Sequence, residues 1–132
     1  MKPNSSRDAI LDAAQTLAAA RGAGHVTLDA VARTCGLSKG GVLYHFPSKN
    51  HLIDGMLGRL IERNQTLMAT HTPPAADGRS LTLAMLDTVR AFREELSSPV
   101  AMAVLAAGAE QPALLAPLRD YIASLNQQLT AL

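Results

Sequence analysis

Hydrophobic residues recur every three or four positions along most of the chain, which is the spacing of one face of an α-helix. The pattern is interrupted by short clusters of Gly, Pro and Ser, and most clearly over residues 71–78. No segment alternates with the period of two that marks a half-buried strand. We therefore predict an all-α fold, with helices at about residues 7–21, 27–35, 38–46, 48 to the break at 71, 80–96, 98–108, and from 112 onward.

Two of the short patterns begin with the same local signal. Thr27 and Ser38 can each accept a hydrogen bond from a free N–H group in the first turn that follows, and a pair of apolar residues flanks each cap. Gly36 suits the left-handed residue that ends a helix, and Pro47 disfavours helical geometry in the residue before it. Two short helices joined by a tight turn predict a helix-turn-helix over residues 27–46.

The second of these helices begins with Lys39-Gly40-Gly41. A glycine in a helix interior costs about 1 kcal/mol relative to Ala, so two adjacent glycines need a physical reason. One reason is contact with DNA, because a helix start without side chains can approach a phosphate or a base edge closely. The other is close packing against the first helix. The sequence leaves both open.

A basic window surrounds this helix. No Asp or Glu occurs between Ala30 and Ile53, and residues 1–64 carry eight Lys and Arg against five acids. Residues 65–132 carry four Arg against six acids. The asymmetry indicates a polyanionic partner for the first half, although a solvated helix face would show the same pattern.

Several side chains in this window have groups that DNA-binding proteins use. Lys39 can donate to guanine O6 and N7, while Tyr44 and Lys49 can reach backbone phosphates. His45 can donate to phosphate or accept from a base, and Thr27 can bond a phosphate through its hydroxyl or amide. Tyr44 could equally be a half-buried core aromatic, and His45 a packing histidine.

These residues carry a family resemblance. The stretches V-T-L-D-A-V-A from Val26 and C-G-L-S-K-G-G-V-L-Y-H-F-P-S-K from Cys35, followed by Leu52-Ile53, resemble the DNA-binding domain of TetR/AcrR transcriptional regulators over roughly residues 6–65. The resemblance implies a dimer that places each reading helix in a major-groove half-site. Many members place the tyrosine one position earlier, where this chain has Leu43.

By position, the resemblance assigns Thr27, Tyr44 and Lys49 to phosphate, and Lys39 with its two glycines to the groove-facing helix start. It also places Phe46 in the domain core. The candidate DNA-contacting residues are therefore Thr27, Ser38, Lys39, Gly40, Gly41, Tyr44, His45 and Lys49.

The resemblance divides the chain into a DNA-binding domain, residues 1–65, and a helical effector-binding and dimerisation domain, residues 66–132. The second part is shorter than in typical members, so we expect it to be truncated, or to pair through the exposed face of its last helix. An apolar stripe could line a pocket for a small-molecule effector or could be plain core; its residues are Met85, Phe92, Met102, Leu105, Leu115 and Leu118.

The function expected is a ligand-responsive repressor that binds a palindromic operator as a homodimer. The alternative is an all-α protein–protein interaction module that does not bind DNA.

Other classes of protein fit poorly. The four histidines lack metal-ligand spacing, and one cysteine, Cys35, allows neither an internal disulfide nor a multi-cysteine zinc site. We therefore expect no enzyme, no catalytic residues, no cofactor and no metal. The N-terminus lacks the apolar stretch of a signal peptide, and the apolar run at residues 100–109 is too short to span a bilayer. We expect a cytoplasmic protein without membrane contact.

Overall fold

The computed structural model describes residues 5–71 and 78–131 of the chain. The predicted all-α fold is confirmed, since the described residues form helices and contain no strand. The elements are α1 (Ser6–Arg21), a 3₁₀ turn η1 (Ala23–His25), α2 (Leu28–Cys35), α3 (Lys39–His45), α4 (Lys49–His71), α5 (Gly78–Leu96), α6 (Pro99–Glu110), a second 3₁₀ turn η2 (Pro112–Leu115) and α7 (Ala116–Thr130).

The starts of the short helices are set by local hydrogen bonds. The Thr27 hydroxyl accepts from the Ala30 N–H at 3.1 Å, and the Ser38 hydroxyl accepts from the Gly41 N–H at 3.1 Å. Both predicted caps are thus confirmed. Gly36 ends α2 in the left-handed conformation with φ 71°, which a residue with a side chain rarely adopts.

The last predicted helix differs from the structure in one respect. Residues 112–115 form the separate turn η2, and α7 begins only at Ala116. Pro117 gives the reason, because a proline has no N–H to donate and its ring clashes with the carbonyl four residues earlier. A proline is tolerated within the first turn, so the α-helix starts just before it. The Pro73-Pro74 part of the predicted break lies outside the described residues.

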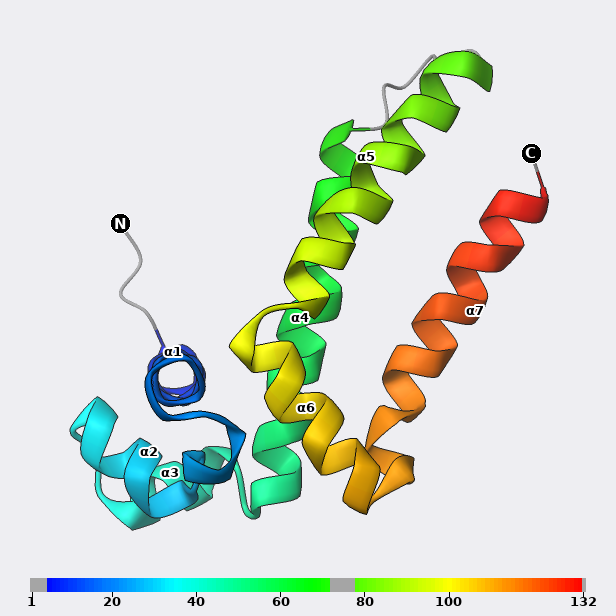
Figure 1. Ribbon diagram of the computed structural model, residues 1–132. Helices are drawn as coiled ribbons and strands as arrows, with labels where there is room; N and C mark the ends of the chain where they lie inside the picture. Colours follow the sequence, from blue (N-terminus) through cyan, green and yellow to red (C-terminus); the bar gives the residue numbers. More distant parts are fainter. Residues whose placement is uncertain (1–4, 72–77, 132) are drawn as a thin grey trace.

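The helices form a compact head and a long arm, as Figure 1 shows. The head consists of α1, α2 and α3, with α4 leaving from it. Helices α4 and α5 run side by side as a hairpin, and α7 packs against α4. Helix α6 lies where the arm meets the head, in contact with α1, η1 and α4.

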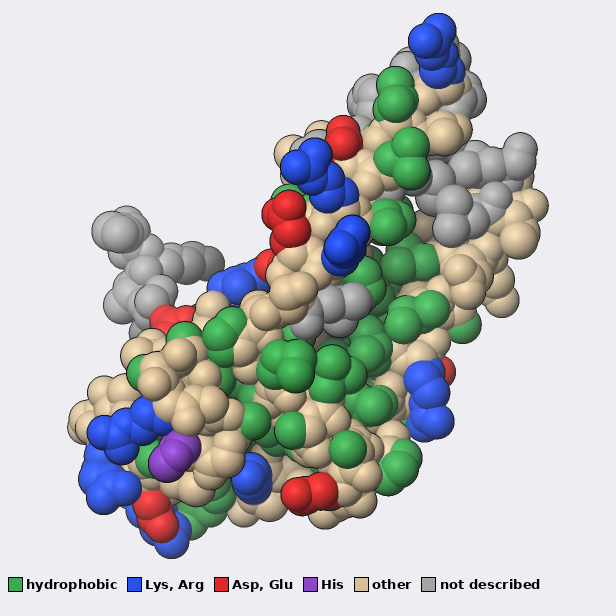
Figure 2. All heavy atoms as spheres, in the orientation of Figure 1, with side chains coloured by type: hydrophobic (Ala, Val, Ile, Leu, Met, Phe, Trp, Pro, Cys, Tyr) green, Lys and Arg blue, Asp and Glu red, His purple; other side chains and the backbone are tan. Residues whose placement is uncertain are grey.

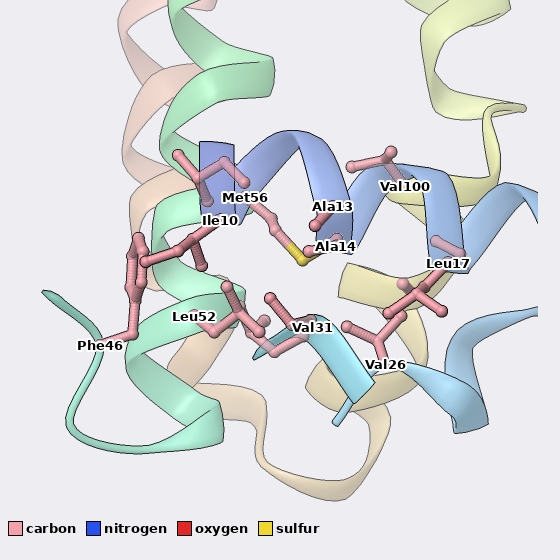
Figure 3. Close-up of a cluster of buried hydrophobic side chains, with 14 of the residues drawn as sticks. Ile10, Ala13, Ala14, Leu17, Val26, Val31, Phe46, Leu52, Met56 and Val100 are labelled. Carbon is pink, nitrogen blue, oxygen red and sulfur yellow. The ribbon is translucent and has the colours of Figure 1, made fainter. Parts of the chain in front are cut away.

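One hydrophobic core runs through both parts. Figure 3 shows Ile10 of α1 beside Leu52 and Met56 of α4, whereas Leu17, further along α1, lies toward Val26, and Val100 of α6 also borders the cluster. Further members come from α2, α3 and α6, and they include Val31, Val42, Phe46, Ala103 and Val104. The burial of this apolar surface is the main stabilising term, at about 25 cal/mol per Å². Helix α6 therefore belongs to the packing of the head as much as to the arm.

Candidate nucleic-acid interface

Helix α3 is held to the head by one side only. Val42 and the capping residue Phe46 are buried, with 0% and 3% of their surface exposed. Lys39 and Gly40 are exposed, and Tyr44 is 83% exposed. Tyr44 is therefore not a core aromatic, whereas Phe46 lies in the core as the resemblance implies. The outer side of α3 is open to a partner.

The paired glycines are not required by packing against α1. A Cβ atom at Gly40 would lie 4.0 Å from its nearest neighbour, the Ser38 hydroxyl. A Cβ at Gly41 would lie 3.3 Å from the same hydroxyl and 3.8 Å from Leu37 Cβ, both in the preceding turn. Neither position faces α1 closely, so the packing alternative fails. The space above Gly40 is left open toward solvent.

Lys39 forms an ion pair that the sequence did not predict. Its Nζ lies 3.2 Å from Asp29 Oδ1, and the two side chains are 59% and 65% exposed. An ion pair this exposed contributes little stability and is easily exchanged for another anion. It nevertheless ties the first turn of α2 to the first turn of α3. No local sequence pattern predicts a contact between the first turns of two separate helices.

The other candidate residues on or next to α2 and α3 keep groups available for hydrogen bonding. Thr27 and Ser38 use an oxygen lone pair as the cap acceptor, and a hydroxyl also carries one hydrogen that can be donated. Tyr44 and His45 stack edge to face with ring centroids 5.0 Å apart. His45 is half-buried, so it is both a packing residue and partly open to solvent.

Lys49 stands apart from this group. It begins α4, is exposed, and lines a cleft with Ala23 and Gly24 of η1 and with Glu110 of α6. Beside it, Asn50 Nδ2 donates to Gln111 Oε1 at 2.8 Å, which joins the start of α4 to the residue that follows α6. Lys49 therefore lies where the head meets α6. Within the described parts of the chain, its ammonium group has no ion pair.

Charged and apolar side chains occupy different parts of the visible face. Figure 2 shows Lys and Arg side chains over the end of the molecule that α2 and α3 form, with an acidic side chain beside them, and further Lys and Arg side chains along the arm next to acidic ones. Green apolar side chains are gathered between the arm helices and α7. Phosphate-binding surfaces carry clustered cations of this kind. The arrangement suits a polyanion at the α3 end.

A second candidate site is an apolar pocket between α4, α5, α6 and α7. It is narrow, with about 20 Å³ open to a water-sized probe, and its walls include Leu57, Ile61, Phe92, Leu105 and Leu118. Three of the six residues suggested for a pocket thus line it. Met102 is instead exposed, and Leu115 packs against Gly108. The side chain of Met85 lies outside the described part of the structure.

Metal sites and membrane-spanning helices are both missing from residues 5–71 and 78–131. Within these ranges, no three His, Cys, Asp or Glu side chains are grouped in a way that could hold a metal ion. None of the helices in the same ranges combines the length and the apolar character that a bilayer crossing requires.

Comparison with known proteins finds a family match for the head and relatives that match most of the chain. Residues 10–56 match the family model described as bacterial regulatory proteins, tetR family. The chain is 34% identical over 98 residues to the HTH-type transcriptional regulator SrpR of Pseudomonas putida, covering 72% of this chain but 45% of SrpR. It is also 34% identical over 98 residues to TtgW of the same species, an uncharacterized HTH-type transcriptional regulator, covering 72% of this chain and 71% of TtgW.

A solved structure shares the whole fold. The crystal structure of the multidrug binding protein EbrR complexed with imidazole superposes with a TM-score of 0.72 at 21% identity, covering 98% of this chain and 73% of EbrR. The helix-turn-helix of α2 and α3, the tetR-family match and the similarity to TtgW agree with one another. The chain belongs to the TetR family of transcriptional regulators.

Proposed function

We propose that the chain binds double-stranded operator DNA as a homodimer, with α3 of each copy in the major groove of one half-site. The observation that carries the proposal is the glycine-led start of α3, which no neighbouring helix covers. Phosphate contacts would come from Thr27, Ser38, Tyr44, His45 and Lys49. Lys39, released from Asp29, would reach a base edge beside Gly40 and Gly41.

We propose the same division of function as the sequence suggests, with α4 as the link. Residues 1–65 would form the DNA-binding domain and residues 66–132 the regulatory domain, and α4 runs through the boundary without a break. We propose a repressor without catalytic activity that acts in the cytoplasm. The chain spans less than half of SrpR.

Regulation by a small molecule would act through α6. Val104 of α6 lines the apolar pocket and also belongs to the core that α6 shares with α1. A ligand that changes the position of α6 would therefore displace the packing of the head. EbrR, which has the same fold, is described as a multidrug binding protein. We propose that a ligand in the pocket weakens DNA binding by changing the spacing of the two reading helices in the dimer.

DNA binding is tested by gel shift with the DNA that flanks the coding region, at two salt concentrations. Phosphate contacts release counterions, so the affinity should fall steeply as salt rises. Lys49→Ala should weaken binding to operator and random DNA alike. Lys39→Ala should alter the preference at one base position.

Arg90→Ala provides a matched control for both variants. Arg90 is exposed on α5 and pairs with Glu94 one turn away, so this variant loses the same charge far from α3. It should bind DNA as the unmodified chain does. If the chain showed no salt-dependent affinity for DNA, the helical interaction module would become the better explanation.

A further inference from the structure

An acidic side chain lies among the cations of the surface proposed for DNA. Asp29 is in the first turn of α2, two residues after Thr27, and is exposed. It is the last acid before the stretch from Ala30 to Ile53, which contains neither Asp nor Glu. A carboxylate on this surface is repelled by the phosphates that the neighbouring cations would attract. Asp29 should therefore weaken DNA binding, unless it has a role that depends on the DNA sequence.

Stability gives only a weak reason for this acid. The Asp29 carboxylate lies 3.2 Å from the Lys39 ammonium group, and the two side chains are 65% and 59% exposed. An ion pair with this exposure contributes little to folding. A carboxylate also gains from the positive end of the helix dipole, but that gain requires no contact with Lys39. The contact joins an acid of α2 to the first residue of α3, so its main consequence is expected where α3 meets DNA.

Lys39 differs from the other cations near α3 in having this partner. Arg33 on α2 and Lys49 at the start of α4 are also exposed, and neither forms an ion pair within residues 5–71 and 78–131. Their full charge remains for DNA phosphates. Lys39 and Asp29 together carry no net charge, and they present donor hydrogens and acceptor oxygens side by side. The pair is therefore suited to a partner that offers both acceptors and donors.

A base pair is such a partner, and a phosphate is not. In the major groove a G·C pair presents guanine O6 and N7 as acceptors beside the amino group of cytosine, which donates. If Lys39 leaves Asp29 for guanine, the cytosine amino group can donate to the carboxylate and replace the lost hydrogen bond. If Lys39 leaves for a phosphate, the carboxylate gains no donor and is repelled by the phosphate charge. The exchange thus favours a base pair over the backbone.

We propose that Asp29 is a specificity-determining residue, which reads one G·C base pair together with Lys39 and keeps Lys39 from binding phosphates on other sequences. The inference rests on the proposed function, which places α3 in the major groove, and it adds an acceptor from α2 to the reading surface. Asp29 lowers the affinity for DNA in general and raises the part of that affinity that depends on sequence.

The test compares Asp29→Ala with the unmodified full chain by gel shift on two duplexes of equal length. One duplex is the DNA that flanks the coding region, the other has a random sequence, and each is measured at several salt concentrations. Asp29→Ala frees Lys39, so it should bind the random duplex more tightly, with a salt dependence steeper by about one phosphate contact. It also loses the contact with cytosine, so the ratio of the two affinities should fall at least about fivefold.

A matched control removes the same charge elsewhere. Glu94 also forms an exposed ion pair, with Arg90 at 3.7 Å on α5. Glu94→Ala changes the net charge of the chain as Asp29→Ala does, and it should leave the affinity ratio unchanged. Circular dichroism checks that both variants keep their helices. A purely structural role of Asp29 would lower the stability of the chain and leave the ratio unchanged.

Single base-pair changes in the flanking duplex locate the effect. Each base pair of the segment that the chain protects is replaced in turn, and the affinity of each duplex is measured. The base pair at which Lys39→Ala loses its preference should also be the one at which Asp29→Ala loses it, because the two side chains read it together.

An unchanged affinity ratio in Asp29→Ala, an equal fall in Glu94→Ala, or a loss of preference at a different base pair would overturn the role of Asp29. In each of these cases the unmodified chain still prefers the flanking duplex, so the proposed function stands. A chain that does not prefer the flanking duplex, or binds no DNA, would contradict the regulator itself and the inference with it.

Discussion

At the scale of single residues, three glycines show two different consequences of a missing side chain. A Cβ atom at Gly55 would lie 2.7 Å from Phe46 Cε1 and 3.3 Å from Leu11 Cδ2, inside the core. One turn further along α4, a Cβ at Gly58 would meet nothing within 4 Å. Gly40 on α3 is similarly open, with its nearest neighbour 4.0 Å away. Gly55 is thus required by packing, and the other two are not.

Gly55→Ala should destabilise the protein, and Gly58→Ala should stabilise it. The new methyl group at position 55 would overpack the core against the buried ring of Phe46, at a cost of about 1–3 kcal/mol. The methyl group at position 58 has free space, so only the better helix propensity of Ala remains, about 0.5–1 kcal/mol. Urea denaturation of both variants measures the two free energies of unfolding. Shifts in the same direction would contradict the packing around Phe46.

Gly40→Ala should increase stability and weaken DNA binding in the same molecule. The open position allows the gain in helix propensity, which is smaller than in a helix interior because Gly40 lies in the first turn. The methyl group would occupy the space proposed for the DNA backbone or a base edge. The measurements are urea denaturation and a gel shift, with Gly58→Ala as the control that changes stability alone. Unchanged DNA affinity in Gly40→Ala would remove the reason proposed for this glycine.

At the scale of elements, α7 is joined to α4 by a buried polar contact. The Tyr121 hydroxyl donates to Asn64 Oδ1, and Asn64 is only 1% exposed. The Nδ2 atom of the same amide has no hydrogen-bond partner among the described residues. The Tyr121 ring also stacks edge to face on Phe92 of α5, with centroids 6.5 Å apart. Tyr121 therefore joins three helices of the arm.

Tyr121→Phe should cost about 1–3 kcal/mol at neutral pH, because it leaves the buried Asn64 oxygen without its donor. The loss should shrink in alkali. Burial raises the pKa of Tyr121 above its ordinary value, so the folded state holds the phenolic proton more tightly than the unfolded state does. The stability that this proton contributes is full below about pH 10, the ordinary pKa, and is lost as the pH rises through the raised pKa.

Phenylalanine has no proton to lose, so the two proteins should approach each other in stability above about pH 10. Urea denaturation at neutral and at alkaline pH measures the difference. Tyr44→Phe is the matched control, since that ring is 83% exposed and its hydroxyl has no buried partner to lose. An unchanged gap between the unmodified chain and Tyr121→Phe in alkali would contradict the role of burial.

The elements also show which parts of the structure can be predicted from sequence. The starts of α2 and α3 could be predicted because Thr27 and Ser38 act on amides three residues away. The exposure of Tyr44 could not, since a tyrosine suits a surface as well as a half-buried face. The Lys39–Asp29 ion pair and the apolar pocket depend on helices that meet only in the folded chain. The helices can thus be predicted from local sequence. Which side chains form a site depends on long-range packing, which the sequence does not reveal.

At the scale of the whole molecule, α6 packs into the same hydrophobic core as the head. Val100, Ala103 and Val104 are buried in the same cluster as Ile10 and Leu17. The Asn50–Gln111 hydrogen bond fixes the far end of α6 to the start of α4. A change in the packing of α6 would therefore reach α3 through the side chains of the shared core.

A chain that ends after His71 should therefore be much less stable than the full chain, although it retains α1 to α4. Removal of α6 exposes the apolar surface that Val100 and Val104 cover, and each such valine contributes about 1.5–3 kcal/mol when buried. A chain that ends after Glu110 keeps α6 and lacks η2 and α7, so it should retain more of the stability of the head. Thermal unfolding followed by circular dichroism compares the three lengths. If the shortest chain unfolded at the same temperature as the full chain, the head would be an independent domain, and α6 could not couple the pocket to α3 through a shared core.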